Sequence, residues 1–246
     1  MKRRGRFERG VTLLELMIAV TLLSVLSLGM FMAMRLGISA LTRTDDKLMT
    51  NRRAAGAQRI LMEELEGLMP VMGICGAAPN GASGGTPDRL PFFQGEAGVM
   101  RLVSTYSLQE SWRGRPQILE MAVIPGESAG VRLVVNEIQY GGPSSTGRIC
   151  TVRPGGGLPQ FTPVQVGPTS FVLADKLAYC RFWYLTPGAR ANDPNVWQPA
   201  WRKQAWPLGV RVEMAPLEAN ASQVQTMTVT APIYVHRSPE IQYGDF

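Results

Sequence analysis

The hydropathy pattern divides the chain into an apolar N-terminal run, an amphipathic stretch and a region of short alternating segments. Residues 11–34 read VTLLELMIAVTLLSVLSLGMFMAM, in which Glu15 is the single charge. As a helix this run reaches about 36 Å, enough to cross a hydrocarbon core of about 30 Å. It is longer than the apolar core of a secretory signal, which holds about 7 to 15 residues. The pattern therefore predicts a transmembrane helix over residues 11–34.

The amphipathic stretch, residues 35–68, continues the helical signal. Its apolar residues form two sets at three-, four- and seven-residue spacings: Ile38, Leu41, Leu48 and Ala55, then Ala57, Leu61, Leu65 and Leu68. On an ideal helix the two sets lie on nearly opposite sides. One helix over residues 11–66, about 85 Å long, is predicted to end at Gly67 and Pro70. The alternative is a second helix, joined by a hinge or kink within residues 42–56.

Residues 69–246 change to short β-rich segments between Gly and Pro clusters. Residues 76–88 have the composition of a loop. Strands are predicted at Val99–Tyr106, Gln117–Ile124, Val131–Ile138, Arg148–Val152, Leu177–Leu185, Val210–Met214 and Thr226–Ala231. In the last two segments, apolar residues alternate with polar ones, as expected of strands with one buried face. The predicted class is α+β: a long N-terminal helix, transmembrane in its first half, packed on a head of antiparallel sheets.

Charge is concentrated at the N-terminus. Residues 1–10 hold five basic residues against Glu8, a balance of +4 out of the chain's +6: Lys2, Arg3, Arg4, Arg6 and Arg9. The rest of the chain is left with only +2, so the basic balance does not indicate a nucleic-acid-binding head. A basic segment before a transmembrane helix predicts that the N-terminus stays in the cytoplasm and the head is exported.

Glu15 sets this apolar run apart from an ordinary anchor. A charge at the centre of a membrane helix costs roughly 2.5 to 3.5 kcal/mol, so a compensating cation is expected. Cleavage after Gly10 would create a free amine on Val11, one helical turn from Glu15. In helices packed side by side, the amine of one could meet the carboxylate of the next. The alternative is an ordinary signal anchor with an incidental Glu near its start.

Residues 9–15, Arg-Gly-Val-Thr-Leu-Leu-Glu, resemble the prepilin cleavage and methylation motif of type IV pilin-like proteins. In that motif a basic leader ends in Gly, and Glu is the fifth residue after the cut. The resemblance implies cleavage after Gly10 by prepilin peptidase, N-methylation of Val11 and an assembly role for Glu15. It also implies a pilin-like fold in a single-pass protein of the inner membrane, with a basic leader at residues 1–10.

The three cysteines are too few for a disulfide scaffold and lack the spacing of a zinc site. In an exported head, one disulfide and one thiol is the simplest arrangement. Cys180 shares strand parity with Phe182 and Tyr184, so it is interpreted as a buried thiol. That interpretation favours a disulfide between Cys75 and Cys150, while the two other pairings stay open.

A second resemblance covers about forty residues of the C-terminal half. Phe-Trp-Tyr-Leu at 182–185, then Trp197 and Trp201, then Pro-Leu-Gly-Val-Arg-Val at 207–212 resemble the head of the minor pseudopilin J of type II secretion systems. The resemblance implies a pseudopilus-tip position beside the minor pseudopilins I and K. Trp197, Trp201 and Trp206 are candidates for a partner-binding patch, because interface hot spots are rich in aromatic residues. Use in the core or as cover for a sheet is the alternative that we favour.

The sequence favours a structural role over an enzymatic one. His236 is the single histidine, no nucleophile motif accompanies it, and no cofactor or metal motif is recognised. The expected function is that of a minor pseudopilin supporting protein export. A minor pilin that primes a type IV pilus is the first alternative, and a membrane-anchored periplasmic enzyme is a remote one. In the favoured interpretation residues 35–68 and the head, residues 69–246, are periplasmic.

Overall fold

The computed structural model describes residues 12–77, 89–109, 112–127, 129–152, 157–190, 192–218 and 226–234. Gly10, Val11 and His236 lie outside these residues, as does most of the loop predicted at residues 76–88. The chain separates into two compact units, Met1–Thr50 and Asn51–Phe246, and we describe each by itself.

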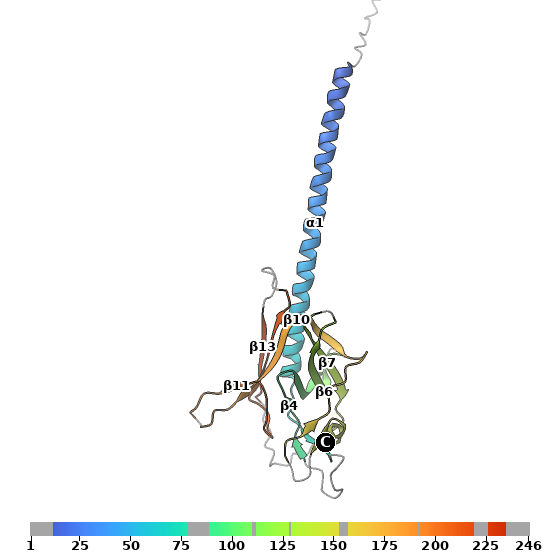
Figure 1. The fold of residues 1–246 in the computed structure, drawn as a ribbon. Helices are drawn as coiled ribbons and strands as arrows, with labels where there is room; N and C mark the ends of the chain where they lie inside the picture. Colours follow the sequence, from blue (N-terminus) through green and yellow to red (C-terminus); the bar gives the residue numbers. More distant parts are fainter. Residues whose placement is uncertain are drawn as a thin grey trace, which may run out of the picture. The chain divides into compact units, whose positions relative to one another are not determined.

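The N-terminal unit and the first part of the second unit are formed by α1 (Leu13–Glu66; Figure 1). Residues 42–56 are helical throughout, so the separate second helix considered for this stretch is not observed. The helix ends where Gly67 and Pro70 predict. The sequence therefore placed this element correctly, to within two residues at its start and at its end.

The second predicted apolar set of α1 packs against the head. Ala57, Leu61 and Leu65 are buried, whereas Ile38 and Leu41 of the first set are exposed in the chain. The first set belongs mainly to the N-terminal unit, which has no sheet of its own among its described residues. The apolar face of the helix therefore changes along the sequence where its side chains begin to pack against the strands of the head.

The C-terminal end of α1 is joined to the head by backbone hydrogen bonds. The carbonyl oxygen of Gly67 accepts a bond from the Thr105 N–H at 2.8 Å, and the Met69 N–H donates to the Val103 carbonyl at 2.8 Å. A Cβ atom added to Gly67 would lie 2.5 Å from the Ser104 hydroxyl oxygen. Glycine suits this position because the chain passes so close to Ser104 of β5. This reason is separate from the general preference for glycine at helix ends.

An eight-stranded antiparallel sheet forms most of the head. Its order is β13-β12-β10-β7-β6-β5-β4, and β11 pairs with β10 beside this path. The strands are β4 (Gln94–Gly95), β5 (Val99–Ser107), β6 (Trp112–Pro125), β7 (Val131–Gln139), β10 (Phe171–Thr186), β11 (Val196–Gln198), β12 (Gly209–Pro216) and β13 (Met227–Pro232). All of the longer strands among them were predicted, although β6 and β10 begin earlier than expected. The alternation predicted for β12 and β13 is present as alternating burial.

Two small sheets and a short helix complete the described part of the head. One sheet pairs β1 (Met72–Ile74) with β3 (Arg89–Pro91), and the other has the order β2 (Gly76–Ala77), β8 (Cys150–Val152) and β9 (Gln160–Phe161). The pairing of β2 with β8 is parallel, an exception to the antiparallel head that was predicted. The 3-10 helix η1 spans Pro143–Arg148. Strand β8 lies within the strand predicted at Arg148–Val152, whereas the other elements of this part are too short to produce a periodic hydropathy signal.

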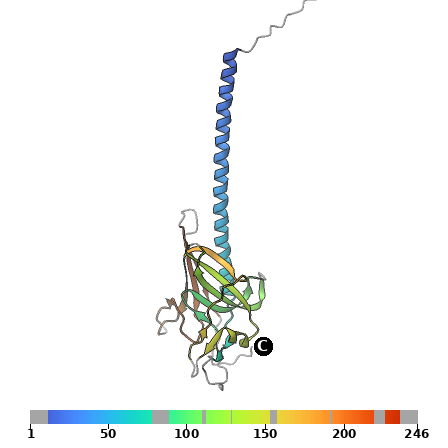
Figure 2. The ribbon, with the colours of Figure 1, turned by 45° about the vertical axis from the view of Figure 1, so that its right-hand side comes forward.

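Strand β10 connects the two halves of the large sheet. Its first part pairs with β7 and its second part with β12, with register shifts near Lys176, which has a positive φ of 54°. Further along, the Phe182 N–H donates to the Ala97 carbonyl beside β4 at 3.0 Å. The sheet therefore curls until its β4 end returns to β10 (Figures 1 and 2).

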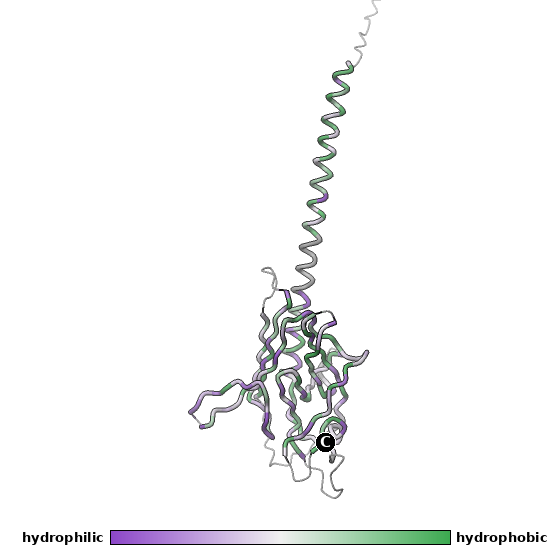
Figure 3. The backbone as a smooth tube through the Cα atoms, in the orientation of Figure 1, coloured by the Kyte–Doolittle hydropathy of each residue, from purple (hydrophilic) through white to green (hydrophobic). Residues whose placement is uncertain are grey.

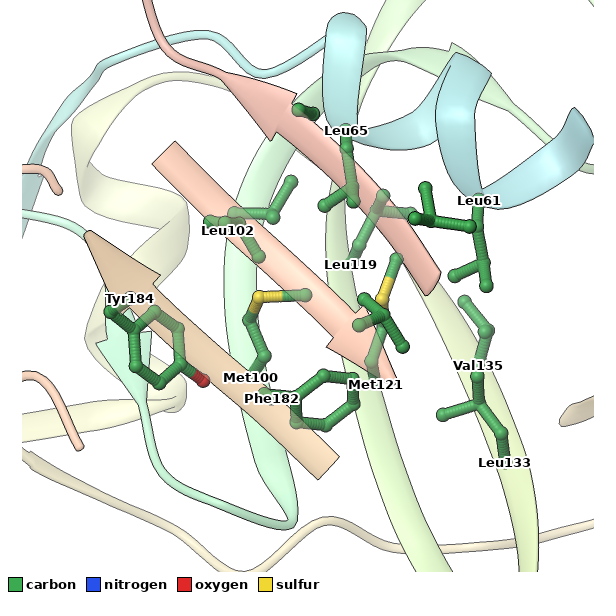
Figure 4. Packing of buried hydrophobic residues seen from close by; sticks show 14 of the residues in the cluster. Leu61, Leu65, Met100, Leu102, Leu119, Met121, Leu133, Val135, Phe182 and Tyr184 are labelled. Carbon is green, nitrogen blue, oxygen red and sulfur yellow. The ribbon is translucent and has the colours of Figure 1, made fainter. Parts of the chain in front are cut away.

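The main hydrophobic core fills the concave side of this curled sheet. Leu61 and Leu65 of α1 lie over Leu102, Leu119 and Met121 of β5 and β6 (Figure 4). From β10, the core receives the side chains of Cys180, Phe182 and Tyr184. Each leucine here is fully or almost fully removed from water, which is worth about 1.5 to 3 kcal/mol per side chain. The C-terminal end of α1 is thus part of the main hydrophobic core of the head.

A second, smaller core lies on the opposite face of β5 and β6, where strand alternation places Val103 and Ile118. Within it, Cys75 and Cys150 form a disulfide, which is the pairing favoured from the sequence. Cys180 is a free, buried thiol in the main core. The disulfide joins the segment after α1 to β8, and so fixes the small sheets to the large one.

Replacing Gly67 by alanine tests the close passage at the end of α1. We expect Gly67→Ala to lower the free energy of unfolding by about 1 to 3 kcal/mol, since the new methyl group would press against Ser104. Gly56→Ala is the matched control, because it lies in the same helix with no atom within 4 Å of the added carbon. That variant should gain up to about 1 kcal/mol. Urea unfolding of the full chain in detergent, followed by tryptophan fluorescence, measures both, and equal effects would contradict the explanation.

Removing the disulfide should destabilise the head strongly. The bridge spans a sequence separation of 75 residues. Closing a loop of that size in the unfolded chain gives an expected loss of about 2 to 5 kcal/mol when both Cys75 and Cys150 are changed to serine. In the same assay, a reducing agent should shift the unfolding midpoint of the natural protein and leave that of the double variant unchanged. A midpoint insensitive to reduction in both proteins would argue against the bridge.

Candidate functional site

The N-terminal part of α1 has the length and composition of a membrane span. The apolar stretch covers Leu13–Leu41, and the chain itself buries none of it. Figure 3 shows mostly hydrophobic colours along this part of the helix. The stretch extends past the predicted limit at Met34, because Arg35 is an isolated charge within a continuing apolar run. Exposed leucine, methionine and phenylalanine side chains on every side require an apolar environment from outside the chain.

Two hydroxyl groups in the first part of this stretch are hydrogen-bonded to the helix itself. Thr21 donates to the carbonyl oxygen of Ile18 at 2.9 Å, and Ser24 donates to that of Val20 at 2.8 Å. Such bonds satisfy polar side chains where lipid offers no partner. The single charged group in residues 11–34 is the carboxylate of Glu15.

Thr12 caps the N-terminus of α1 immediately beside Glu15. Its hydroxyl oxygen accepts a hydrogen bond from the Glu15 backbone N–H at 3.3 Å, and its carbonyl oxygen accepts one from the Leu16 N–H at 3.2 Å. Thr-Leu-Leu-Glu at 12–15 is also the sequence pattern of a capping box, a signal that our sequence analysis did not use. The cap fixes the start of the helix, and so places Glu15 in its first turn.

The position of Glu15 suits a carboxylate electrostatically, but only in part. An acidic group in the first turn faces the positive end of the helix dipole, worth about 0.3 to 1 kcal/mol. Within the described residues, no cation forms an ion pair with Glu15. Gly10 and Val11 lie outside the described part, so neither cleavage nor methylation is tested by the structure. What the structure provides is a capped helix that presents a single acid at the start of an apolar rod.

The structure does not bring the three tryptophans of the candidate partner-binding patch together. Trp201 and Trp206 are buried in the main core, and the Trp201 indole N–H donates to the carbonyl oxygen of Ala205 at 2.6 Å. Trp197 is half-buried on β11. The three side chains therefore do not share a surface. For Trp201 and Trp206 the alternative of core packing holds. The segment after β11 is joined to β4, because the Trp201 backbone N–H donates to the Gly95 carbonyl oxygen at 2.8 Å.

Trp197 instead belongs to a polar-aromatic cluster on the outer face of the large sheet. The Arg211 guanidinium lies over its ring, 4.1 Å from the ring centre, and is 3.6 Å from the Glu213 carboxylate. Glu213 also accepts a hydrogen bond from the Trp183 indole N–H at 3.0 Å. These side chains come from β10, β11 and β12, whose register places Trp183 opposite Arg211. In this cluster Trp197 serves as cover for the sheet.

A buried ion pair in the head was not anticipated from the sequence. Arg101 and Glu120 are direct cross-strand partners on the face opposite the main core, with an Nε–Oε1 distance of 2.7 Å. Arg101 also donates to Gln94 and to the Thr162 carbonyl, while Asn136 donates to Glu120. Every partner is engaged, which is how a buried pair becomes tolerable. This network holds the segment after β9 against the sheet.

In the part of the chain that the structure describes, no group of three or more His, Cys, Asp or Glu side chains is placed to hold a metal ion.

One comparison with known proteins identifies the N-terminal site. A family model described as "Prokaryotic N-terminal methylation motif" matches residues 5–31. The match includes Gly10, Val11, Glu15 and most of the apolar run. No curated protein and no solved structure matches the chain. The matched motif is of the prepilin type and supports a type IV pilin-like protein, either a pilin or a pseudopilin, that is a substrate of prepilin peptidase.

Proposed function

We propose that this pilin-like protein is a minor pseudopilin of a type II secretion system, which assembles at the tip of the pseudopilus and supports protein export. Its role is structural and not enzymatic. The observation that carries the assembly role is the lone carboxylate of Glu15 at the capped start of an exposed apolar helix, within the methylation motif.

The assembly step follows from charge in a low-dielectric environment. Removal of the leader after Gly10 exposes the amine of Val11, which becomes N-methylated and keeps its positive charge. In a bundle of such helices, the amine of one subunit meets the Glu15 carboxylate of its neighbour. Two opposite charges 4 Å apart attract by about 4 kcal/mol at an effective dielectric constant of 20. This attraction sets the axial register, while the apolar faces of the helices supply the contact area.

The head supports the choice of the J-type minor pseudopilin. The residues that carry the resemblance fall on three consecutive strands of the large sheet, with Phe182 in β10, Trp197 in β11 and Val212 in β12. Along β10 and β12 they alternate between the two faces: Phe182 and Val212 are paired in the main core, and their neighbours Trp183 and Arg211 are paired on the outer face. The resembling segment therefore forms one continuous part of the head. In the proposed function, this part places the protein at the pseudopilus tip beside the I and K subunits.

The same proposal assigns an orientation. The basic leader stays in the cytoplasm, α1 crosses the inner membrane once, and the head lies in the periplasm. The disulfide between Cys75 and Cys150 suits that compartment, since disulfides persist in oxidising surroundings.

Substituting Gly10 tests processing. Gly10→Ala should leave the full-length precursor in the membrane, because the prepilin motif places Gly immediately before the cut. Intact-mass measurement of the membrane-extracted protein reports loss of residues 1–10 and a methyl group on Val11 together. The head should remain folded in the variant, as judged by its disulfide. Normal processing of Gly10→Ala would count against the motif.

Substituting Glu15 tests assembly separately. Glu15→Ala should be cleaved normally, yet its incorporation into pseudopili should fall at least tenfold, since the attraction to the neighbouring amine is lost. Thr21→Ala, in the same apolar stretch, is the control that leaves the charge in place and should assemble normally. Cross-linking in cells followed by co-purification with the other subunits measures incorporation. Unimpaired assembly of Glu15→Ala would refute the pairing.

Deletion of the gene separates the secretion role from the pilus role. Loss of protein export with surface pili retained is expected. Loss of pili with export retained would favour the alternative, a minor pilin that primes pilus assembly.

A further inference from the structure

Glu64 is a buried acid on the face of α1 that packs against the sheet. It lies between the core residues Leu61 and Leu65 in the sequence, and its exposed fraction is 0%. Neither carboxyl oxygen has a hydrogen-bond partner. The neighbouring Ser104 hydroxyl donates instead to the backbone carbonyl oxygen of Glu64, at 2.9 Å. Burying an ionised carboxylate without partners costs free energy, so this place favours the neutral form of the group.

The charged groups that act on Glu64 are themselves acids. Glu137 of β7 is held in place by the Ser107 hydroxyl, 3.2 Å away, and by backbone N–H groups of the following turn. Glu63, next to it in α1, pairs with Arg59 at 2.8 Å. From β5, the Tyr106 phenol also faces these acids. Burial first, then the charge of Glu137 and more weakly that of Glu63, raise the pKa of Glu64 to about 8, although the nearby Ser104 hydroxyl acts in the opposite direction by favouring the ionised form.

We infer that Glu64 makes the contact between α1 and the sheet of the head dependent on a proton: the neutral carboxyl allows Leu61 and Leu65 to pack, and its ionisation opposes that packing. The inference stands on the position of the side chain and its unpaired oxygens, and does not depend on the proposed function. When Glu64 ionises, its carboxyl group releases one proton to water.

The direction of the pH dependence follows from linkage. The ordinary pKa of the group is 4.5, and in the folded protein it is raised to about 8. Between these values the folded state holds a proton that the unfolded state has released. The stability of the head should therefore be greatest in acid and fall as the pH rises through this window, by up to about tenfold in the unfolding equilibrium constant per pH unit. An ordinary paired carboxylate would give the opposite slope.

Urea unfolding of the full chain in detergent, at pH 5.5 and pH 8.5, tests the inference. The window suits the test, because ordinary Asp and Glu side chains are already ionised there and the chain has a single histidine. The natural protein should lose at least tenfold in its folding equilibrium constant between the two pH values. Glu64→Gln, a neutral side chain of the same shape, should lose much less. Glu218→Gln, at an exposed acid, is the control and should behave like the natural protein.

Two further measurements test the inference even if Glu64→Gln does not fold. Glu64→Leu should also show a weak pH dependence and should be the more stable protein at pH 8.5, since it replaces an unpaired acid by an apolar side chain. In the natural protein, amide protection factors around Leu61 and Leu65, corrected for intrinsic exchange, should fall as the pH rises. A pH dependence shared equally by the natural protein, Glu64→Gln and Glu64→Leu would overturn the inference.

Discussion

The head depends on the insertion of the end of α1 into the concave side of a curled sheet. Leu61 and Leu65 supply the apolar surface, and the passage at Gly67 brings the backbone close enough to hydrogen-bond with Thr105 of β5. Because the sheet curls until β4 returns to β10, removal of this helix would take Leu61 and Leu65 out of the core on its concave face. The helix therefore fills the core and also links the head to the N-terminal unit through a continuous element.

Glu15 and Glu64 both lie in apolar surroundings, where a charge is costly, but their environments differ. Glu15 is at the capped, positive end of the helix, exposed on the surface of an apolar segment, and available to a cation from another molecule. Glu64 is enclosed by its own head, next to Glu137, and has no such access. The first arrangement suits intermolecular pairing of charges. The second favours a neutral group, and makes one contact within the head sensitive to protons.

Several elements could be predicted because their cause is local. The apolar run, the end of the helix near Gly67 and the alternation in β12 and β13 all follow from periodicity and residue type. The short strands β1 to β4 could not be predicted from the sequence, because two or three residues are too few to show a periodic pattern. The ion pair of Arg101 with Glu120 was also missed, because charges that alternate along a strand indicate a wet face. Here the β9 segment covers that face, and nothing near Arg101 in the sequence reveals it.

By itself, the sequence determined the apolar helix of membrane-spanning length, the methylation motif around Gly10 and Glu15, and the α+β class, because each depends on neighbours along the chain. Only the tertiary structure decided that Trp201 and Trp206 are core residues, that Gly67 is needed for a close passage, and that Glu64 is buried without a partner. The physical reason is that burial of a side chain is set by segments distant in sequence. Periodicity can tell which face of an element is apolar, but not what comes to cover the other face.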